Sequence, residues 1–152
     1  MAELKNRMRA DLTTAMKGRE ELRASTLRMA LTAVTNAEVA GKQARELTDD
    51  QVVDVVASEA KKRREAATAY DSAGRADLAD KERTEAEILA AYLPQPLSGA
   101  EIAALVSATI ERLGVAGDGK AMGKVMGALQ AQTRGRADGG AVAAEVRSQL
   151  AG

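Results

Sequence analysis

Apolar residues along this chain recur at intervals of three and four, the spacing that places side chains on one face of an α-helix. Leu4, Met8 and Leu12 form the first such stripe. Similar stripes follow each interruption, and β-branched residues are few and mostly fall at the same helical spacing. The pattern predicts an all-α protein, with helices over residues 3–17, 20–40, about 48–70, 77–92, 99–113, 120–132 and 140–150.

Capping signals and prolines divide these helices into two groups. A Ser or Thr followed three residues later by Glu or Gln is a capping box, and the sequence has one at Thr48 and another at Ser98. Both prolines lie in the segment YLPQPLS, residues 92–98, where they end a helix and stiffen the chain. We therefore predict an N-terminal domain of about four helices over residues 1–93 and a C-terminal three-helix domain over residues 98–152.

The tetrapeptide Gly-Arg-Ala-Asp occurs twice, at residues 74–77 and at residues 135–138. The sequences around the two copies differ, so they do not indicate a domain repeat. We expect the same turn in both places: the glycine takes the left-handed position that ends one helix, and the aspartate caps the next.

Composition excludes several classes of function. The chain has 22 basic and 22 acidic residues, so its net charge attracts neither nucleic acid nor membrane, and an electrostatic role must be local. Cysteine and histidine are absent, which removes thiolate nucleophiles, the commonest general base and the usual metal ligands. The acidic group Glu82, Glu85 and Glu87 lacks the histidines that helical-bundle metal sites use. We therefore expect no catalytic residues, metal or cofactor, in a soluble cytoplasmic protein without membrane contact.

The segment Gly114–Ala121 is similar to a phosphate-binding loop but fails in two respects. Ala121 stands where a serine or threonine hydroxyl must hold magnesium. The segment also follows a predicted helix, whereas such a loop follows a strand. We therefore expect no ATP binding of this kind.

The stretch from Gly119 to Gly140 carries the strongest local charge. It contains Lys120, Lys124, Arg134 and Arg136, with no acidic residue between positions 118 and 138. None of the four falls on the apolar stripe of the predicted helix. Local positive charge beside glycines suits a phosphate backbone, although a solvated surface is the ordinary interpretation of such a run. A second basic run, residues 61–64, wraps around its helix and makes no single patch.

Five segments, taken in order, resemble a known family. Together they look like the YqeY-like family (the GatB/YqeY domain), which is similar to the tail region of the B subunit of the tRNA-dependent amidotransferase. The segments are AMKGREELRASTLRMALTAV (residues 15–34), residues 70–78, YLPQPLS (92–98), MGKVM (122–126) and GRADG (135–139).

The resemblance implies an all-helical protein of two lobes and a tRNA-binding accessory role without catalysis of its own. It places the nucleic-acid contacts at Lys120, Gly123, Lys124, Arg134 and Arg136, and it suggests tRNA-charging or amidotransferase enzymes as partners. Two alternatives stay open. One is a contribution to glutamine-dependent carbon–nitrogen ligase activity, and the other is a protein-interaction adaptor that binds no RNA.

Overall fold

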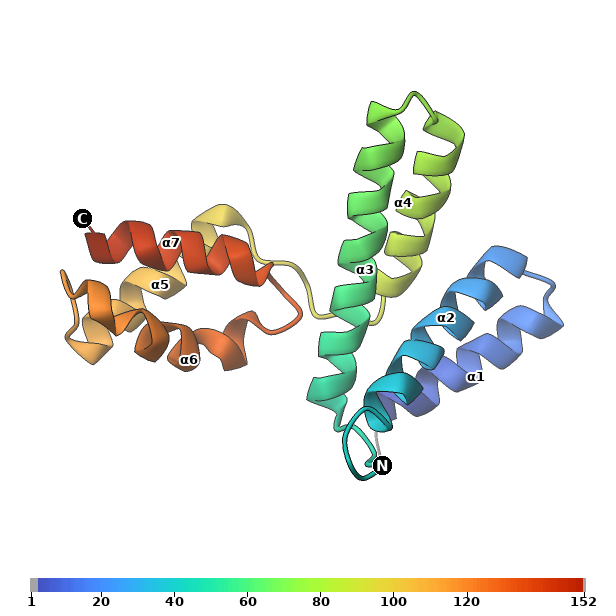
Figure 1. Ribbon diagram of the computed structural model, residues 1–152, viewed down its shortest axis with the longest axis horizontal. Coiled ribbons are helices and arrows are strands. Elements are labelled where there is room, and N and C mark those ends of the chain that lie inside the picture. The colour runs from blue at the N-terminus through green and yellow to red at the C-terminus, as the bar shows by residue number, and fades with distance from the viewer. Residues whose placement is uncertain (1–2, 152) are drawn as a thin grey trace. The chain divides into compact units, whose positions relative to one another are not determined.

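The computed structural model describes residues 3–151, and every regular element within them is helical, which confirms the predicted all-α class. No helix in this part of the chain combines the length and the apolar character needed to cross a bilayer. The elements are α1 (Glu3–Lys17), α2 (Glu21–Glu38), α3 (Asp49–Ser72), α4 (Ala76–Ala90), α5 (Gly99–Leu113), the short 3-10 helix η1 (Gly119–Ala121), α6 (Met122–Thr133) and α7 (Gly139–Ala151) (Figure 1).

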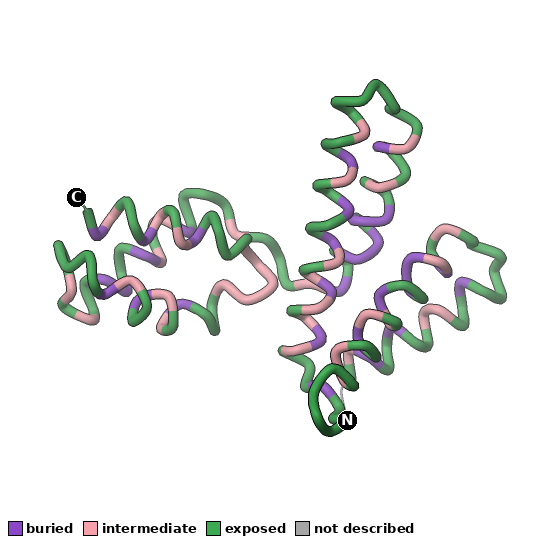
Figure 2. The backbone as a smooth tube through the Cα atoms, in the orientation of Figure 1, coloured by how far each residue is buried: buried purple, intermediate pink, exposed green. Residues whose placement is uncertain are grey.

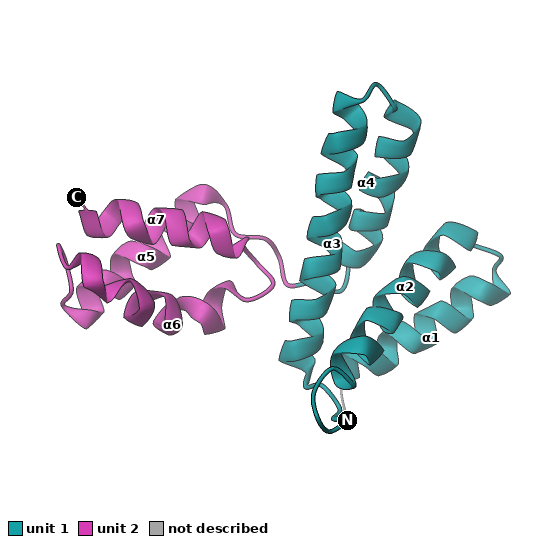
Figure 3. Ribbon diagram, viewed as in Figure 1, with its two compact units in different colours: residues 1–93 teal, residues 94–152 magenta. Residues whose placement is uncertain are grey.

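The chain divides into two compact units, residues 1–93 and residues 94–152 (Figure 3). The N-terminal unit consists of two helical hairpins, α1–α2 and α3–α4, joined by the loop between α2 and α3. Its core is formed by the inward stripes of all four helices (Figure 2). The principal core residues are Met8, Leu27, Ala30, Val34, Val52, Val56, Ala60 and Leu89.

Polar contacts connect the ends of these helices across long sequence separations. The ammonium of Lys5 lies 2.7 Å from Glu38 Oε1, and both side chains are largely buried. The Leu47 amide donates to the other oxygen of Glu38. The ammonium and this amide hold the pKa of Glu38 below its ordinary value. Near the middle of α1, the Asp11 carboxylate accepts from the Tyr92 hydroxyl.

The basic run at residues 61–64 does not form one surface. The guanidinium of Arg63 is buried, and its Nη1 donates to the backbone oxygen and to the carboxylate of Glu59. Its Nε lies 3.4 Å from the buried carboxylate of Glu85 on α4, and its Nη2 donates to the sulfur of Met29 on α2. Arg63 thus connects three helices, while Lys62 lies at the surface and pairs with Glu59.

The two Gly-Arg-Ala-Asp turns share their glycine conformation but not their caps. Gly74 and Gly135 both have positive φ, at 74° and 71°, as expected. The carboxylate of Asp138 accepts from the Ala141 amide and caps α7. The predicted cap at Asp77 is wrong, because α4 begins at the preceding residue and Asp77 lies inside its first turn. One residue separates Gly74 from the start of α4, whereas three residues separate Gly135 from the start of α7.

Candidate nucleic-acid interface

The three helices of the C-terminal unit enclose an almost entirely aliphatic core. Val106, Val125 and Val146, one from each of α5, α6 and α7, are fully buried, and Leu129 lies beside them. Val125 and Leu129 are four residues apart, so they fix which face of α6 points inward. The opposite face of α6 is left to solvent.

Lys120 and Lys124 lie at the amino-terminal end of α6, one just before the helix and one in its first turn, and both are exposed. Lys120 belongs to η1, where the Asp118 carboxylate accepts from its backbone amide and so begins the turn. Lys124 lies in the first turn of α6, which contains no acidic residue. The amino-terminal end of a helix carries a partial positive charge, so the two ammonium groups and the helix dipole have the same sign here.

Gly123 and Gly127 continue the outer face between and beyond the lysines. Both are exposed, and a Cβ atom built at either would meet nothing within 4 Å. Packing within the unit therefore does not require a glycine at either position, although each destabilises the helix by about 1 kcal/mol relative to alanine. The consequence is a strip of bare helix backbone that a partner can approach closely.

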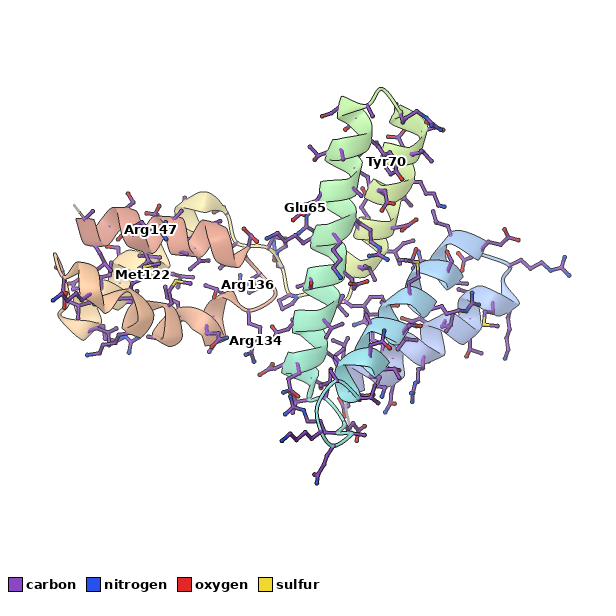
Figure 4. The ribbon with its side chains drawn as sticks, in the orientation of Figure 1. Glu65, Tyr70, Met122, Arg134, Arg136 and Arg147 are labelled. Atoms are coloured by element: carbon purple, nitrogen blue, oxygen red, sulfur yellow. The ribbon has the colours of Figure 1, made fainter. Side chains whose placement is uncertain are left out.

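The two arginines of the basic stretch lie on the connection between α6 and α7 and are half-buried (Figure 4). Arg136 takes part in the packing of the unit, although it lies outside the apolar stripe of α6. Its Nε donates to the Gln95 carbonyl at 2.8 Å, and its own carbonyl accepts from the Leu97 amide at 2.8 Å. These bonds attach the proline segment to the C-terminal unit.

The segment attached by Arg136 leads directly into the cap of α5. The Ser98 hydroxyl accepts from the Glu101 amide, and the Glu101 carboxylate accepts from the Ser98 amide, which is the predicted capping box. The Ser98 amide and hydroxyl, with a smaller effect from Arg136, lower the pKa of Glu101. Sequence reasoning missed this role of Arg136, because its partner lies 41 residues away and no local pattern records it.

The structure therefore separates the five predicted residues into two sets. Lys120 in η1 and Gly123 and Lys124 in the first turn of α6 are exposed at the beginning of that helix, whereas Arg134 and Arg136 belong to the half-buried turn at its far end. The loop that resembles a phosphate-binding loop follows helix α5, as predicted, and Gly114 and Gly117 adopt positive φ within it.

The sequence matches the family described as Yqey-like protein over residues 5–150. The chain belongs to this family. An uncharacterized protein of Schizosaccharomyces pombe, C22F3.15, is 35% identical over 92 residues, which cover 60% of this chain and 72% of that protein. The family match covers both units, since the matched residues extend from α1 to α7.

Proposed function

We propose that the C-terminal unit of this Yqey-like protein binds the phosphate backbone of RNA through the outer face of α6, and that it acts as a non-catalytic accessory module for tRNA. The observation that carries the proposal is the exposure of Lys120 and Lys124 on either side of Gly123, whose Cβ position is open. The resemblance of the family to the amidotransferase tail supports tRNA as the RNA concerned.

The chemistry of this face suits a phosphodiester chain better than a protein surface. Two ammonium groups lie at the positive end of a helix, and the glycine between them allows a backbone phosphate to come close to the main chain. The chain has only two aromatic residues, Tyr70 and Tyr92, and neither belongs to this unit. Stacking of bases on aromatic rings therefore contributes nothing in this unit, and recognition rests on charge and shape.

An electrophoretic mobility shift with total tRNA, repeated at several salt concentrations, tests the proposal. We expect Lys120→Ala with Lys124→Ala to weaken binding at low salt and to reduce the slope of log affinity against log salt by about 1.4 to 1.8, because each phosphate contact contributes about 0.7 to 0.9. Arg112→Ala with Arg147→Ala is the matched control, because both residues are exposed bases of the same unit outside the basic stretch.

Arg136 is left intact in this experiment, because its removal would disturb the attachment of the proline segment. Gly123→Leu provides an independent variant: it keeps every charge, fills the open space and is expected to weaken tRNA binding while helicity is kept. Equal tRNA binding by the parent, the lysine double variant and Gly123→Leu would refute the proposal.

A further inference from the structure

A groove lies in the N-terminal unit between the first turn of α2 and the second half of α4. Its volume is about 480 Å³. The lining side chains on α4 span about two helical turns, or roughly 10 Å at 1.5 Å per residue. The groove is lined by Glu20, Glu21, Leu22, Arg23, Thr84, Glu87, Ile88 and Ala91.

The floor of the groove is apolar and its rim is acidic. Leu22 is half-buried, Ile88 is buried at the edge of the core and Ala91 is exposed. Three glutamates surround this floor, and the one base is Arg23, which lies 3.9 Å from Glu20 with both side chains about half exposed. The groove therefore carries a net negative charge beside a strip of aliphatic surface.

Local stability explains the glutamates on α2 but not the one on α4. Glu20 and Glu21 lie at the amino-terminal end of α2, where negative charge is favourable. Glu87 lies in the last turn of α4, where negative charge opposes the helix dipole; this turn has no base of its own, and Arg7 of α1 donates to the Ala91 carbonyl just beyond it. Among residues 3–151, we find no ion pair for Glu21 or Glu87, so both carboxylates are available to a partner.

The apolar surface continues along α2 beyond the groove. Met29 follows Leu22 by seven residues, which places both on one face of the helix; its sulfur accepts from Arg63, and 51% of the residue is exposed. A methionine side chain adapts its shape to a partner surface at little energetic cost. Thr84 and Ile88 on α4, and Ala91 at its carboxyl-terminal cap, show the spacing with which one helix packs against another.

We propose that this groove binds a basic amphipathic helix of another protein. The aliphatic side chains of that helix would lie on Leu22, Ile88 and Ala91, and its lysines or arginines would pair with Glu21 and Glu87. The helix-packing spacing of the lining residues favours a helix as the occupant, and the acidic rim selects the sign of its charge. This interaction is independent of RNA binding by the C-terminal unit.

The test uses the full chain and two synthetic amphipathic helices with identical leucines, one with lysines on its polar face and one with glutamates there. We expect the lysine peptide to bind with salt-dependent affinity and to shift the amide resonances of Leu22, Ile88 and Ala91. Glu21→Lys with Glu87→Lys should weaken its binding by about tenfold, because two attractions become repulsions. Glu65→Lys with Glu111→Lys, which reverses two exposed acids outside the groove, should leave affinity within twofold.

Circular dichroism and thermal unfolding establish that each variant folds, and Glu87→Gln provides a milder change with an expected loss of about threefold. Equal binding of the two peptides, shifts outside the groove, or unchanged affinity in the double variant would overturn the proposal. Shifts of the groove resonances with protein concentration alone would also overturn it, because the occupant would then be a second copy of this chain.

Discussion

The N-terminal unit keeps charged side chains inside its helix contacts, whereas the C-terminal unit places an aliphatic core inside and its lysines outside. Arg63 and Glu85 are each less than a tenth exposed in the first unit. The buried polar residue of the second core is Thr109, whose hydroxyl donates to a carbonyl of its own helix. The buried charges of the N-terminal unit favour particular contacts between its helices. In the C-terminal unit, the outer face of α6 makes no contribution to the core.

This difference shows where charge in the sequence has a structural role and where it does not. A buried ion pair stabilises little in itself, but breaking one leaves a charge without its partner, so the pair defines the geometry of the hairpins. Bases on an exposed helix face carry no such constraint. The predictions below test the contrast, from the largest expected effect to the smallest.

Removal of the Arg63 guanidinium should have the largest effect. Arg63→Ala leaves the Glu85 carboxylate buried and unpaired, and we expect the free energy of unfolding to fall by about 3 kcal/mol. Burial and the neighbouring Glu82 already raise the pKa of Glu85. Loss of the arginine should raise it further, so the variant should be relatively more stable at mildly acidic pH and lose that stability as pH rises.

Chemical denaturation at several pH values measures this effect, with Arg75→Ala as the control, because both side chains of the Arg75–Asp77 pair are more than half exposed. We expect the control to change stability by less than about 0.5 kcal/mol. Combining Arg63→Ala with Glu85→Gln should recover part of the loss and remove the added pH dependence. A single variant as stable as the parent would mean that the buried pair does not hold the hairpins together.

Truncation of the second core should unfold the C-terminal unit selectively. Leu129 is fully buried, so Leu129→Ala should destabilise this unit by about 3 kcal/mol through lost contacts and a residual cavity. Hydrogen exchange should then lose protection in α5, α6 and α7 while α1 to α4 keep theirs. Gln130→Ala, at the exposed neighbouring position, is the control. Uniform loss of protection in both units would show that they unfold as one.

Loss of the Tyr92 hydroxyl should have an intermediate effect. Burial, and then its bond to Asp11, raise the pKa of Tyr92 to about 12. Tyr92→Phe should reduce stability by about 1.5 kcal/mol, since it removes a hydrogen bond to a charged acceptor. Because the folded pKa lies above the ordinary value of 10, the parent should lose this contribution as pH rises from 10 towards 12, and the variant should not. Difference titrations of the two proteins, which cancel the lysines, provide the measurement.

The sequence alone is sufficient to predict the all-α class and most helix boundaries, because stripes, capping boxes and glycine stops are local signals. The capping boxes at Thr48 and Ser98 are both present. Exposure of Lys120 and Lys124 also follows locally, since neither falls on the apolar stripe.

Contacts between residues that are far apart along the chain could not be predicted from the sequence. Glu85 lies 22 positions from Arg63, and Gln95 lies 41 positions from Arg136, so no periodicity pairs them. The misplaced cap at Asp77 has the same origin, because identical tetrapeptides enter helices at different points. Which charges become structural therefore depends on the packing of whole helices, and the groove between α2 and α4 is visible only after that packing is known.

The smallest predicted effect concerns the left-handed residues that end helices in the two units. Arg19 has φ 57° after α1, in a turn where the Glu20 amide donates to the Ala15 carbonyl, whereas Gly114 has φ 67° after α5. A side chain in this conformation costs about 1 kcal/mol, and glycine adds entropy to the unfolded chain that offsets part of the gain. Arg19→Gly should therefore stabilise the protein by about 0.5 kcal/mol, and Gly114→Ala should destabilise it by about 1 kcal/mol.

Arg19→Ala is the control that distinguishes relief of backbone strain from loss of charge. It keeps the strained backbone, so its free energy of unfolding should stay within about 0.3 kcal/mol of that of the parent. Stabilisation by both Arg19 variants to the same extent, measured by thermal unfolding, would attribute the effect to lost charge instead of relieved strain.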